Sequence, residues 1–494
     1  MRLRKSNFYF LLLICFFGNI SVQAQSGIYF DSRHSFLIPM MQDNILKGHA
    51  YVYELDKVSK DSNSFMIQVF DEFLHDVGEK KFMMSSKCEF KAAVFNGAEI
   101  ITKFENEKRG INYVVFDQQA HLLYDTLLLV KLRNPDIKSE SDFQQTPMAV
   151  LSNQSTLDYV LTDNGGTLLV CLTRDHQIWT YPFASNKSQS VQFLAGDDHL
   201  IVQSVYTYTQ RPFGNLVYTK LLVLSAYGVK IQETNLFVND STSIYPIAAD
   251  IDKKGISVIS QYTRRAHEFA KVKYGVCLHN FDLNGKLQNS FFNDFTSNLA
   301  RDSVFKKYKL MVHSYLYMHK ATRLRNGNWL LAAEQFQKTR MKIGLGRNKN
   351  IVYNKKNIAL FEVDDQAEIV KMHVEPNKPD GARIPRRYYR NPQAGSMFAN
   401  ANGKLDIDYF IHDEHSKTDK ISFVFTDGNY ITQKLSLGNI VYRDGDFTVD
   451  RFVIPMFSKH TKLAILPARY GHSLLIKFDP VLGLFDFDTI KFNN

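Results

Sequence analysis

The chain is poor in cysteine, proline and tryptophan, with four Cys, 13 Pro and two Trp among 494 residues. So few cysteines exclude a disulfide-stabilised scaffold, and Cys88, Cys171 and Cys277 do not have the spacing of a metal site. Cys171 and Cys277 lie inside apolar runs, so we expect buried thiols there. No Pro-rich or Ser/Gly-rich tract offers a linker, which favours a single domain over residues 25–494.

Long hydrophobic runs are absent beyond the amino terminus, so no transmembrane span is expected. The amino terminus itself has the three parts of a secretion signal. Three basic residues stand within residues 2–5, residues 8–17 are apolar, and Ala24 ends a small-residue cleavage site. The sequence therefore predicts a signal peptide over residues 1–24 and export to the periplasm or the cell surface.

The common catalytic motifs are also missing. The chain has no Gly-x-Ser-x-Gly elbow, no His-Glu-x-x-His pair and no phosphate-binding glycine loop. The dense polar run at residues 412–415 is interpreted as a turn, because four consecutive side chains cannot all reach one ion. We expect no cofactor and no metal, and the absence of these motifs favours a non-catalytic protein.

What the chain does have is a short repeated pattern: an apolar residue, an aromatic residue or Leu, then a small or acidic residue before a turn. Its copies are Val69-Phe70-Asp71, Val115-Phe116-Asp117, Val223-Leu224-Ser225, Asn280-Phe281-Asp282, Leu360-Phe361-Glu362, Val424-Phe425-Thr426 and Lys477-Phe478-Asp479. Most gaps are roughly 45 to 80 residues, and one gap of 108 residues predicts a degenerate copy near Trp179. Strand-forming repeats of this length are typical of a β-propeller.

Asn/Gly-rich turns that feed apolar strands divide the chain into about eight units of four strands each, and seven is the alternative. The predicted units are 35–85, 90–132, 150–190, 192–240, 245–295, 318–376, 396–440 and 452–494. The third unit is short for four strands. Strands that are apolar on both faces fit sheets packed between neighbouring sheets, so the predicted fold is an all-β propeller with loop insertions.

Two insertions interrupt the repeat. Residues 296–309 could form a short helix, and residues 337–357 carry seven basic side chains. A second basic cluster, interleaved with tyrosines, follows near residue 386. The candidate binding residues in the two basic clusters are Arg340, Lys342, Arg347, Arg383, Arg386, Arg387, Tyr388, Tyr389 and Arg390.

Arginine forks bind carboxylate, sulfate or phosphate, and tyrosine rings stack on sugars. With a formal net charge of +10, the chain is expected to meet an anionic glycan, a lipid headgroup or a protein, and no nucleic acid. The alternative is a solvated surface loop that keeps the protein soluble.

Two further groups could face the central channel of a propeller. His313 and Tyr315 alternate on one strand, either lining the channel or packing between blades. Asp406 and Asp408 share one face of another strand, as paired carboxylates for sugar hydrolysis would. A hydrolase or lyase would gather such acids from three or more blades.

The chain resembles uncharacterised exported β-propeller proteins of the phylum Bacteroidota. The resemblance rests on the signal segment and on the repeats at 281–285 (Phe-Asp-Leu-Asn-Gly) and 325–330 (Arg-Asn-Gly-Asn-Trp-Leu). It implies a periplasmic or surface location and assigns no catalytic residue. The sequence thus favours a binding or scaffold module for a polymer or protein partner; the alternative is a carbohydrate-active hydrolase or lyase with its site in the central channel.

Overall fold

The fold is given by a computed structural model of the chain. It describes residues 28–30, 35–42, 44–106, 110–133, 148–183, 189–209, 216–236, 242–264, 273–295, 303–308, 310, 314–342, 349–377, 381–383, 406–413, 415–429, 434–458, 460–479, 481–482 and 484–493. The predicted signal peptide lies outside these residues, so it stays a prediction.

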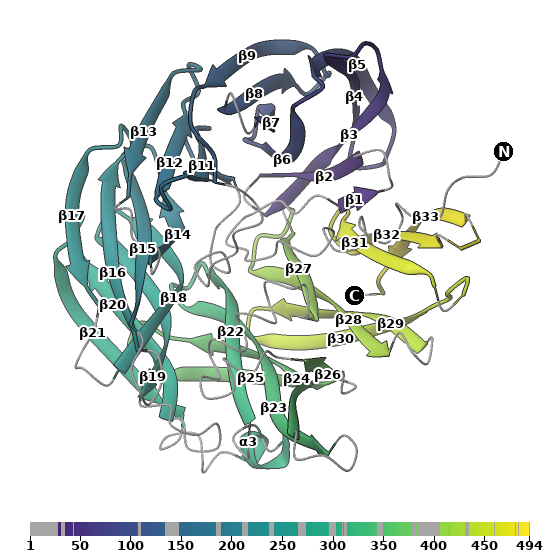
Figure 1. The fold of residues 1–494 in the computed structure, drawn as a ribbon. Coiled ribbons are helices and arrows are strands. Elements are labelled where there is room, and N and C mark those ends of the chain that lie inside the picture. Colours follow the sequence, from purple (N-terminus) through teal and green to yellow (C-terminus); the bar gives the residue numbers. More distant parts are fainter. Residues whose placement is uncertain are drawn as a thin grey trace.

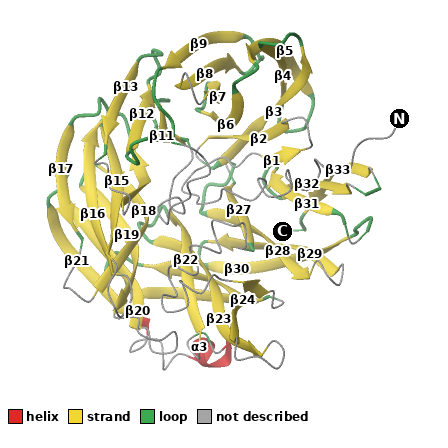
Figure 2. Ribbon diagram, viewed as in Figure 1, coloured by secondary structure: helices red, strands yellow, loops and turns green. Residues whose placement is uncertain are grey.

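Eight antiparallel sheets follow one another along the chain and stand in a ring, with the first strand of each sheet toward the centre (Figures 1 and 2). Within each sheet the strands pair in the order of the sequence. The protein is therefore an all-β, eight-bladed β-propeller of four-stranded antiparallel sheets, and the short third unit is a blade. Three sheets depart from four strands: the first and sixth have five and the eighth has three among the described residues.

Blades 1 to 4 are formed by the first seventeen strands. Blade 1 is β1 (Ile28–Phe30), β2 (Ser35–Gln42), β3 (Ile45–Lys57), β4 (Ser62–Phe70) and β5 (Asp76–Ser85). Blade 2 is β6 (Glu89–Phe95), β7 (Glu99–Asn106), β8 (Gly110–Asp117) and β9 (Leu122–Leu128). Blade 3 is β10 (Ala149–Val150), β11 (Thr156–Leu161), β12 (Thr167–Leu172) and β13 (Ile178–Pro182). Blade 4 is β14 (Gln189–Gly196), β15 (Leu200–Thr209), β16 (Leu216–Ser225) and β17 (Lys230–Asn235).

Blades 5 to 8 complete the ring. Blade 5 is β18 (Thr242–Asp252), β19 (Gly255–Arg264), β20 (Lys273–Phe281) and β21 (Leu287–Asp294). The helix α3 (Ser303–Tyr308) follows, within the insertion predicted to be helical. Blade 6 is β22 (Ser314–Arg323), β23 (Trp329–Lys342), β24 (Lys349–Val363), β25 (Ile369–Pro376) and β26 (Gly381–Arg383). Blade 7 is β27 (Ile407–His412), β28 (Lys420–Asn429), β29 (Lys434–Arg443) and β30 (Asp446–Ile454), and blade 8 is β31 (Lys462–Pro467), β32 (His472–Asp479) and β33 (Leu484–Lys491).

In blades 2, 4, 5 and 6 the repeated sequence pattern lies at the end of the third strand, just before the turn into the fourth strand. In blades 1 and 8 it ends β4 and β32, just before the turn into the outermost strands β5 and β33. In blade 2, Oδ1 of Asp117 accepts hydrogen bonds from the backbone N–H groups of Gln119 (2.9 Å) and His121 (2.7 Å). Ala120 then takes a left-handed conformation (φ 64°), and the ladder shifts by one residue beside the turn. This is a type I turn followed by a bulge, which explains why the pattern needs an acceptor side chain at its third position.

The hydrophobic core is divided among the spaces between neighbouring blades. Adjacent residues of one strand pack against different neighbouring blades. Ile100 of β7 packs in the cluster shared with blade 1, and Ile101 packs in the cluster shared with blade 3. Because side chains alternate across a strand, both faces of a sandwiched sheet must be apolar. Cys171 and Cys277 are fully buried in these clusters and unpaired, as predicted.

The predicted seventh unit was misplaced. Its strands begin at Ile407 and end at Ile454, so the pattern at Phe425 falls in the second strand of blade 7. The predicted copy near Trp179 is the turn after Leu172, where Thr173 accepts the hydrogen bonds of His176 and Gln177. A third-strand aromatic is therefore not an obligatory mark of every blade.

Candidate binding site on blade 6

Blade 6 carries a long hairpin beyond its blade sheet. β23 has 14 residues and β24 has 15, and their pairing continues from Phe336 and Lys355 to Lys342 and Lys349. Figure 1 shows the hairpin end of these strands reaching past the rest of blade 6 at the lower edge of the view. We call residues 336–342, 349–355 and 381–383 the blade 6 extension.

Residues of both basic clusters lie in this extension. β26 pairs with β24 on the edge opposite β23, which places Arg383 across from Val352, while Arg340 lies across from Ile351. One strand thus separates the backbones of two arginines that are far apart in the sequence. At the level of the backbone, the extension therefore unites Arg340 and Lys342 of the first cluster with Arg383 of the second in one three-stranded unit.

The remaining predicted site residues are placed as follows. The backbones of Arg340, Lys342 and Arg383 are described, in β23 and β26. Outside the described residues lie Arg347, Arg386, Arg387, Tyr388, Tyr389, Arg390 and His313. Their proposed contacts stay predictions.

Tyr315 is fully buried in β22, and its ring centroid lies 4.7 Å from that of Tyr274 in blade 5. Burial raises the pKa of Tyr315 well above its ordinary value. The sequence left open whether Tyr315 lines the central channel or packs between blades. Its position in the structure agrees with packing between blades.

A polar clasp closes the base of the segment that bears the second basic cluster. The segment leaves blade 6 at Asn377 and enters blade 7 at Asp406, and Asn377 Nδ2 donates a 2.6 Å hydrogen bond to Asp406 Oδ2. Lys355 Nζ, at the root of the extension, forms an ion pair with the other oxygen of Asp406. Asn377 and Asp406, the residues that flank positions 378–405, are therefore held together beside the extension.

Behind the clasp lies a buried cluster of charged side chains between blades 6 and 7. Oε1 of Glu334 accepts hydrogen bonds from the backbone N–H groups of Asp406 (2.8 Å) and Ile407 (2.9 Å). His319 Nε2 lies 3.4 Å from the same oxygen, a contact too poorly aligned to count as a hydrogen bond. Lys320 Nζ donates to the backbone oxygen of Asp408 at 3.0 Å. The cluster ties the innermost strands of the two blades together.

Burial dominates the electrostatics of this cluster. It raises the pKa of Asp408 to about 7, although a 2.8 Å hydrogen bond from Thr426 Oγ1 favours the ionised carboxylate. It lowers the pKa of Lys320 to about 8 and lowers that of His319. Burial also raises the pKa of Asp406 against the attraction of Lys355.

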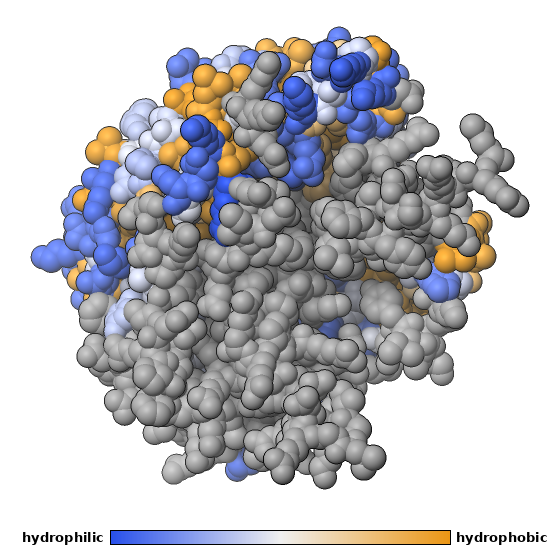
Figure 3. Space-filling view, in the orientation of Figure 1, coloured by the Kyte–Doolittle hydropathy of each residue, from blue (hydrophilic) through white to orange (hydrophobic). Residues whose placement is uncertain are grey.

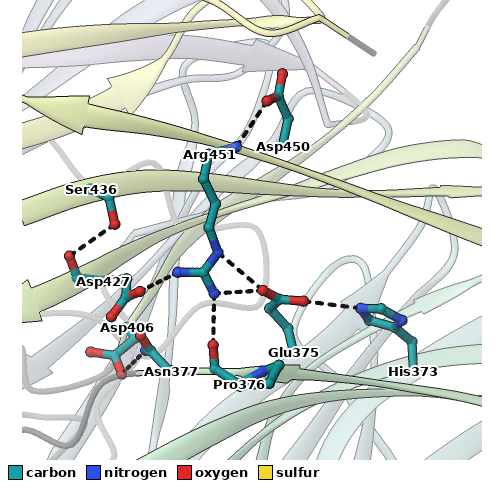
Figure 4. A network of polar contacts seen from close by, with 9 residues as sticks. All are labelled: His373, Glu375, Pro376, Asn377, Asp406, Asp427, Ser436, Asp450 and Arg451. Carbon is teal, nitrogen blue, oxygen red and sulfur yellow. Dashed lines mark hydrogen bonds and ion pairs between the residues drawn. The ribbon is translucent and has the colours of Figure 1, made fainter.

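A second bridge joins the outer parts of the same two blades, as Figure 4 shows. The guanidinium of Arg451 in β30 donates from Nε (3.0 Å) and Nη2 (2.5 Å) to Oε1 of Glu375 in β25, and from Nη2 to the backbone oxygen of Pro376 at 2.7 Å. Its Nη1 pairs with the buried Asp427. A planar fork with several donors suits such a junction, so Arg451 fixes the end of β25 just before the clasp.

The sequence pointed to Asp406 and Asp408, and it included Lys355 among the seven basic residues of the insertion at 337–357. It missed Glu334 and Arg451. Glu334 did leave a signal, because it interrupts the apolar run of β23 at a position where both faces of the strand are buried. Arg451 left no signal in the sequence, because it stands on an outer strand in which polar and apolar residues are mixed.

The charged groups of this cluster hold blades 6 and 7 together through ion pairs and hydrogen bonds. They do not form a recognisable catalytic arrangement. The described acids of the cluster come from blades 6 and 7 only, and Lys320 and Lys355 lie against them. Within the described ranges, no group of three or more His, Cys, Asp or Glu side chains is arranged to hold a metal ion. In the same part of the chain, no helix is long and apolar enough to cross a membrane.

Comparison with known proteins places the chain in a family. A model of a family of unknown function, DUF6770, matches residues 5–479, so the protein belongs to this family. It is a β-propeller of that family, and no curated protein matches it.

Several solved structures show weak similarity to the chain. The WD40 domain of SCAP from fission yeast is 7% identical, with 93% of this chain and 81% of that chain covered and a TM-score of 0.32. The β-propeller domain of the Trilobed protease from Pyrococcus furiosus is 9% identical (72% and 98% covered, TM-score 0.33). An alpha-L-arabinofuranosidase from Fusarium graminearum is also 9% identical (70% and 92% covered, TM-score 0.31).

Proposed function

We propose that the protein is an exported, non-catalytic binding or scaffold module that docks an anionic polymer on the blade 6 extension. The observation that carries this proposal is the pairing of β26 with β24, which brings Arg383 beside the strand that pairs with Arg340. Insertions on a rigid scaffold are where binding residues usually gather. The predicted signal peptide supports a periplasmic or surface location.

Several features favour an anionic partner. Arginines present fixed forks to carboxylate, sulfate or phosphate groups, and a polymer can engage several of them together. The clasp between Asn377 and Asp406 holds the ends of the tyrosine-bearing segment near the same extension. An acidic polysaccharide is the partner that this combination fits best, and a lipid headgroup or an acidic protein are the other outcomes of the test.

The test compares the natural chain with the triple variant Arg340→Ala/Lys342→Ala/Arg383→Ala. The probes are a sulfated polysaccharide, polygalacturonate, lipopolysaccharide, phosphatidylglycerol vesicles and neutral dextran. We expect binding to an acidic polysaccharide that is at least about tenfold weaker in the variant and that weakens with salt, because three charges at about 0.5 kcal/mol each are lost.

A charge-matched control removes three exposed lysines of blade 1, in the variant Lys80→Ala/Lys81→Ala/Lys87→Ala. Binding should survive this change. An equal loss of binding in both variants would mean that only the overall charge of the protein matters. Unchanged binding in the first variant would refute the role of the extension.

A hydrolase or lyase site in the central channel is the second candidate. One observation favours it: Asp408 stands at a bulge of the innermost strand β27, stays partly exposed, and has a pKa of about 7, which suits a general acid. Asp408→Asn should then abolish release of reducing ends from an acidic polysaccharide. No product release by the natural chain on a panel of such polymers would exclude this candidate for those substrates.

A further inference from the structure

A basic cluster lies where the last blade meets the first. Arg469 stands in the turn between β31 and β32, and Lys491 is the last residue of β33. His472, the first residue of β32, is the cross-strand partner of Lys491. In blade 1, the turn between β4 and β5 carries Phe73, whose ring is contacted by Arg469. We call Phe73, Arg469, His472 and Lys491 the closure cluster.

Two contacts orient the guanidinium of Arg469. Its central carbon lies 5.2 Å from the centre of the Phe73 ring, and its Nη2 donates a 3.2 Å hydrogen bond to Nε2 of His472. Nε2 can accept because the other ring nitrogen, Nδ1, donates to the backbone oxygen of Tyr470 at 3.3 Å. Among the described residues, nothing accepts a hydrogen bond from Nε or Nη1 of Arg469. The guanidinium is therefore held in place with donors left for a ligand.

Local turn chemistry places Phe73. Oδ1 of Asp71 accepts hydrogen bonds from the backbone N–H groups of Phe73 and His75, both at 2.8 Å, and Oδ2 lies 3.0 Å from Nδ1 of His75. The carboxylate of Asp71 is thus engaged within its own turn. Phe73 remains 52% exposed, with its ring under the guanidinium of Arg469. Such a ring orients a cation at the surface without cancelling its charge.

The closure cluster brings cations together without a matching acid. In the part of the chain that the structure describes, no carboxylate oxygen lies within 4 Å of the charged nitrogens of Arg469 or Lys491. Burial lowers the pKa of His472, and the positive charges of Arg469 and Lys491 lower it further, although the contact with Tyr470 opposes them. A bound anion would remove this repulsion, so the arrangement is that of an anion site.

The surface beside the cluster suits a small charged ligand better than an apolar partner. β5 exposes Glu79, Lys80 and Lys81 between Val77 and Met83. Figure 3 shows hydrophilic and hydrophobic residues interspersed at the upper right of the molecule, over β4 and β5. An apolar interface would require a continuous hydrophobic area.

We propose that the closure cluster binds one doubly charged tetrahedral group, a phosphate or a sulfate. Arg469 supplies a fork of N–H donors and Lys491 a point charge, which are the two ways in which basic side chains contact such groups. The group is either a free ion or an ester on a sugar, and the probes below distinguish these sources. The cluster lies on blades 1 and 8 and does not depend on the function proposed for the blade 6 extension.

The first test measures affinity by isothermal titration calorimetry at low salt. The probes are inorganic sulfate, inorganic phosphate and glucose 6-phosphate, with glucose as the neutral control. We expect Arg469→Gln and Lys491→Gln each to weaken binding of the charged probes about tenfold, because each removes a charge-assisted contact. Arg174→Gln, an equal charge change in an exposed turn of blade 3, should leave the affinity unchanged.

Tighter binding of glucose 6-phosphate than of inorganic phosphate would support an ester as the ligand, and the reverse order would support a free ion. The proposal would be overturned by no binding of any charged probe, by an equal loss in Arg174→Gln, or by glucose binding as tightly as glucose 6-phosphate.

The second test locates the bound ion by NMR of the natural chain with labelled histidines. Sulfate should shift the imidazole signals of His472 and leave those of the exposed His121 unchanged. Phe73→Leu should weaken sulfate binding about threefold, because Arg469 loses its aromatic support, and Phe73→Tyr, which keeps the ring, should not. Sulfate binding without a shift at His472, or with an equal shift at His121, would mean that the ion binds elsewhere and would overturn the proposal.

Discussion

His49 provides the sharpest test of how the ring is closed. It lies in β3 of blade 1, only 1% exposed, and its Nε2 donates a 2.9 Å hydrogen bond to the backbone oxygen of Pro467 in blade 8. The acceptor is a carbonyl, so Nε2 carries the proton. The other ring nitrogen, Nδ1, has no hydrogen-bond partner among the described residues. The site accommodates neutral histidine and has no acceptor for a second proton.

Burial accordingly lowers the pKa of His49 to about 4, against a partial opposing effect of the Pro467 contact. The unfolded chain binds a proton near pH 6.5, so between pH 6.5 and 4 it holds more protons at this site than the folded protein does. Stability from this site is complete above pH 6.5 and is lost as the pH falls toward 4. The difference of about 2.5 pKa units corresponds to about 3 kcal/mol.

The perturbation is His49→Gln, whose side-chain amide can still donate to Pro467 but cannot gain a proton. The assay is the free energy of unfolding from urea denaturation at pH 7 and at pH 4.5. The variant should lose less stability than the natural chain on acidification, by about 2 to 3 kcal/mol. His49→Ala should cost about 3 kcal/mol at pH 7, because it removes the hydrogen bond to Pro467 and leaves a cavity.

The control is His121→Gln, since the His121 side chain is 74% exposed on a turn. An acid sensitivity in His49→Gln equal to that of the natural chain would refute the reasoning, because it would mean that His49 is protonated in the folded ring or does not join blades 1 and 8.

Three further predictions concern the junction of blades 6 and 7. Arg451→Met should lower the free energy of unfolding by about 3 kcal/mol, since it removes the positive charge that pairs with the buried Asp427, and the double variant Arg451→Met/Asp427→Leu should recover part of this in the same denaturation assay. Asn377→Ala should increase proteolytic cleavage within residues 378–405 without a comparable loss of global stability, as measured by limited proteolysis beside urea denaturation, because the clasp to Asp406 holds only the ends of that segment. Gly438→Ala should cost about 1 to 3 kcal/mol, because a Cβ there would lie 2.1 Å from the Phe425 ring, and Phe425→Leu in the same chain should relieve part of the cost.

The sequence predicted the architecture because each blade is encoded locally. The acceptor at Asp117, the left-handed residue after it and the apolar runs around it recur within a few residues of one another. A local signal of this kind survives without knowledge of the rest of the chain. The pairing of β26 with β24 leaves no such signal, because the paired residues are separated by 26 or more residues in the sequence.

The candidate site was predictable only in its composition. The basic residues around Arg340 and Arg383 were visible, and the structure adds that their strands share one extension. The burial of Asp406 beside Glu334 and Lys355 could not be foreseen from the sequence. These residues are far apart in the chain and meet only in the folded protein. The blade 7 boundary was misjudged for a similar reason: Phe425-Thr426 copies the pattern of a third strand but lies within β28, where its partners are Gly438 and Leu437 of β29.

Residue-resolved hydrogen exchange with and without an acidic polysaccharide tests the central claim most directly. If the protein is a binding module that uses the blade 6 extension, added polymer should slow exchange in residues 336–342, 349–355 and 381–383 and leave the innermost strands β22 and β27 unchanged. Slowed exchange at β22 and β27, with the extension unaffected, would contradict the account and place the partner in the central channel.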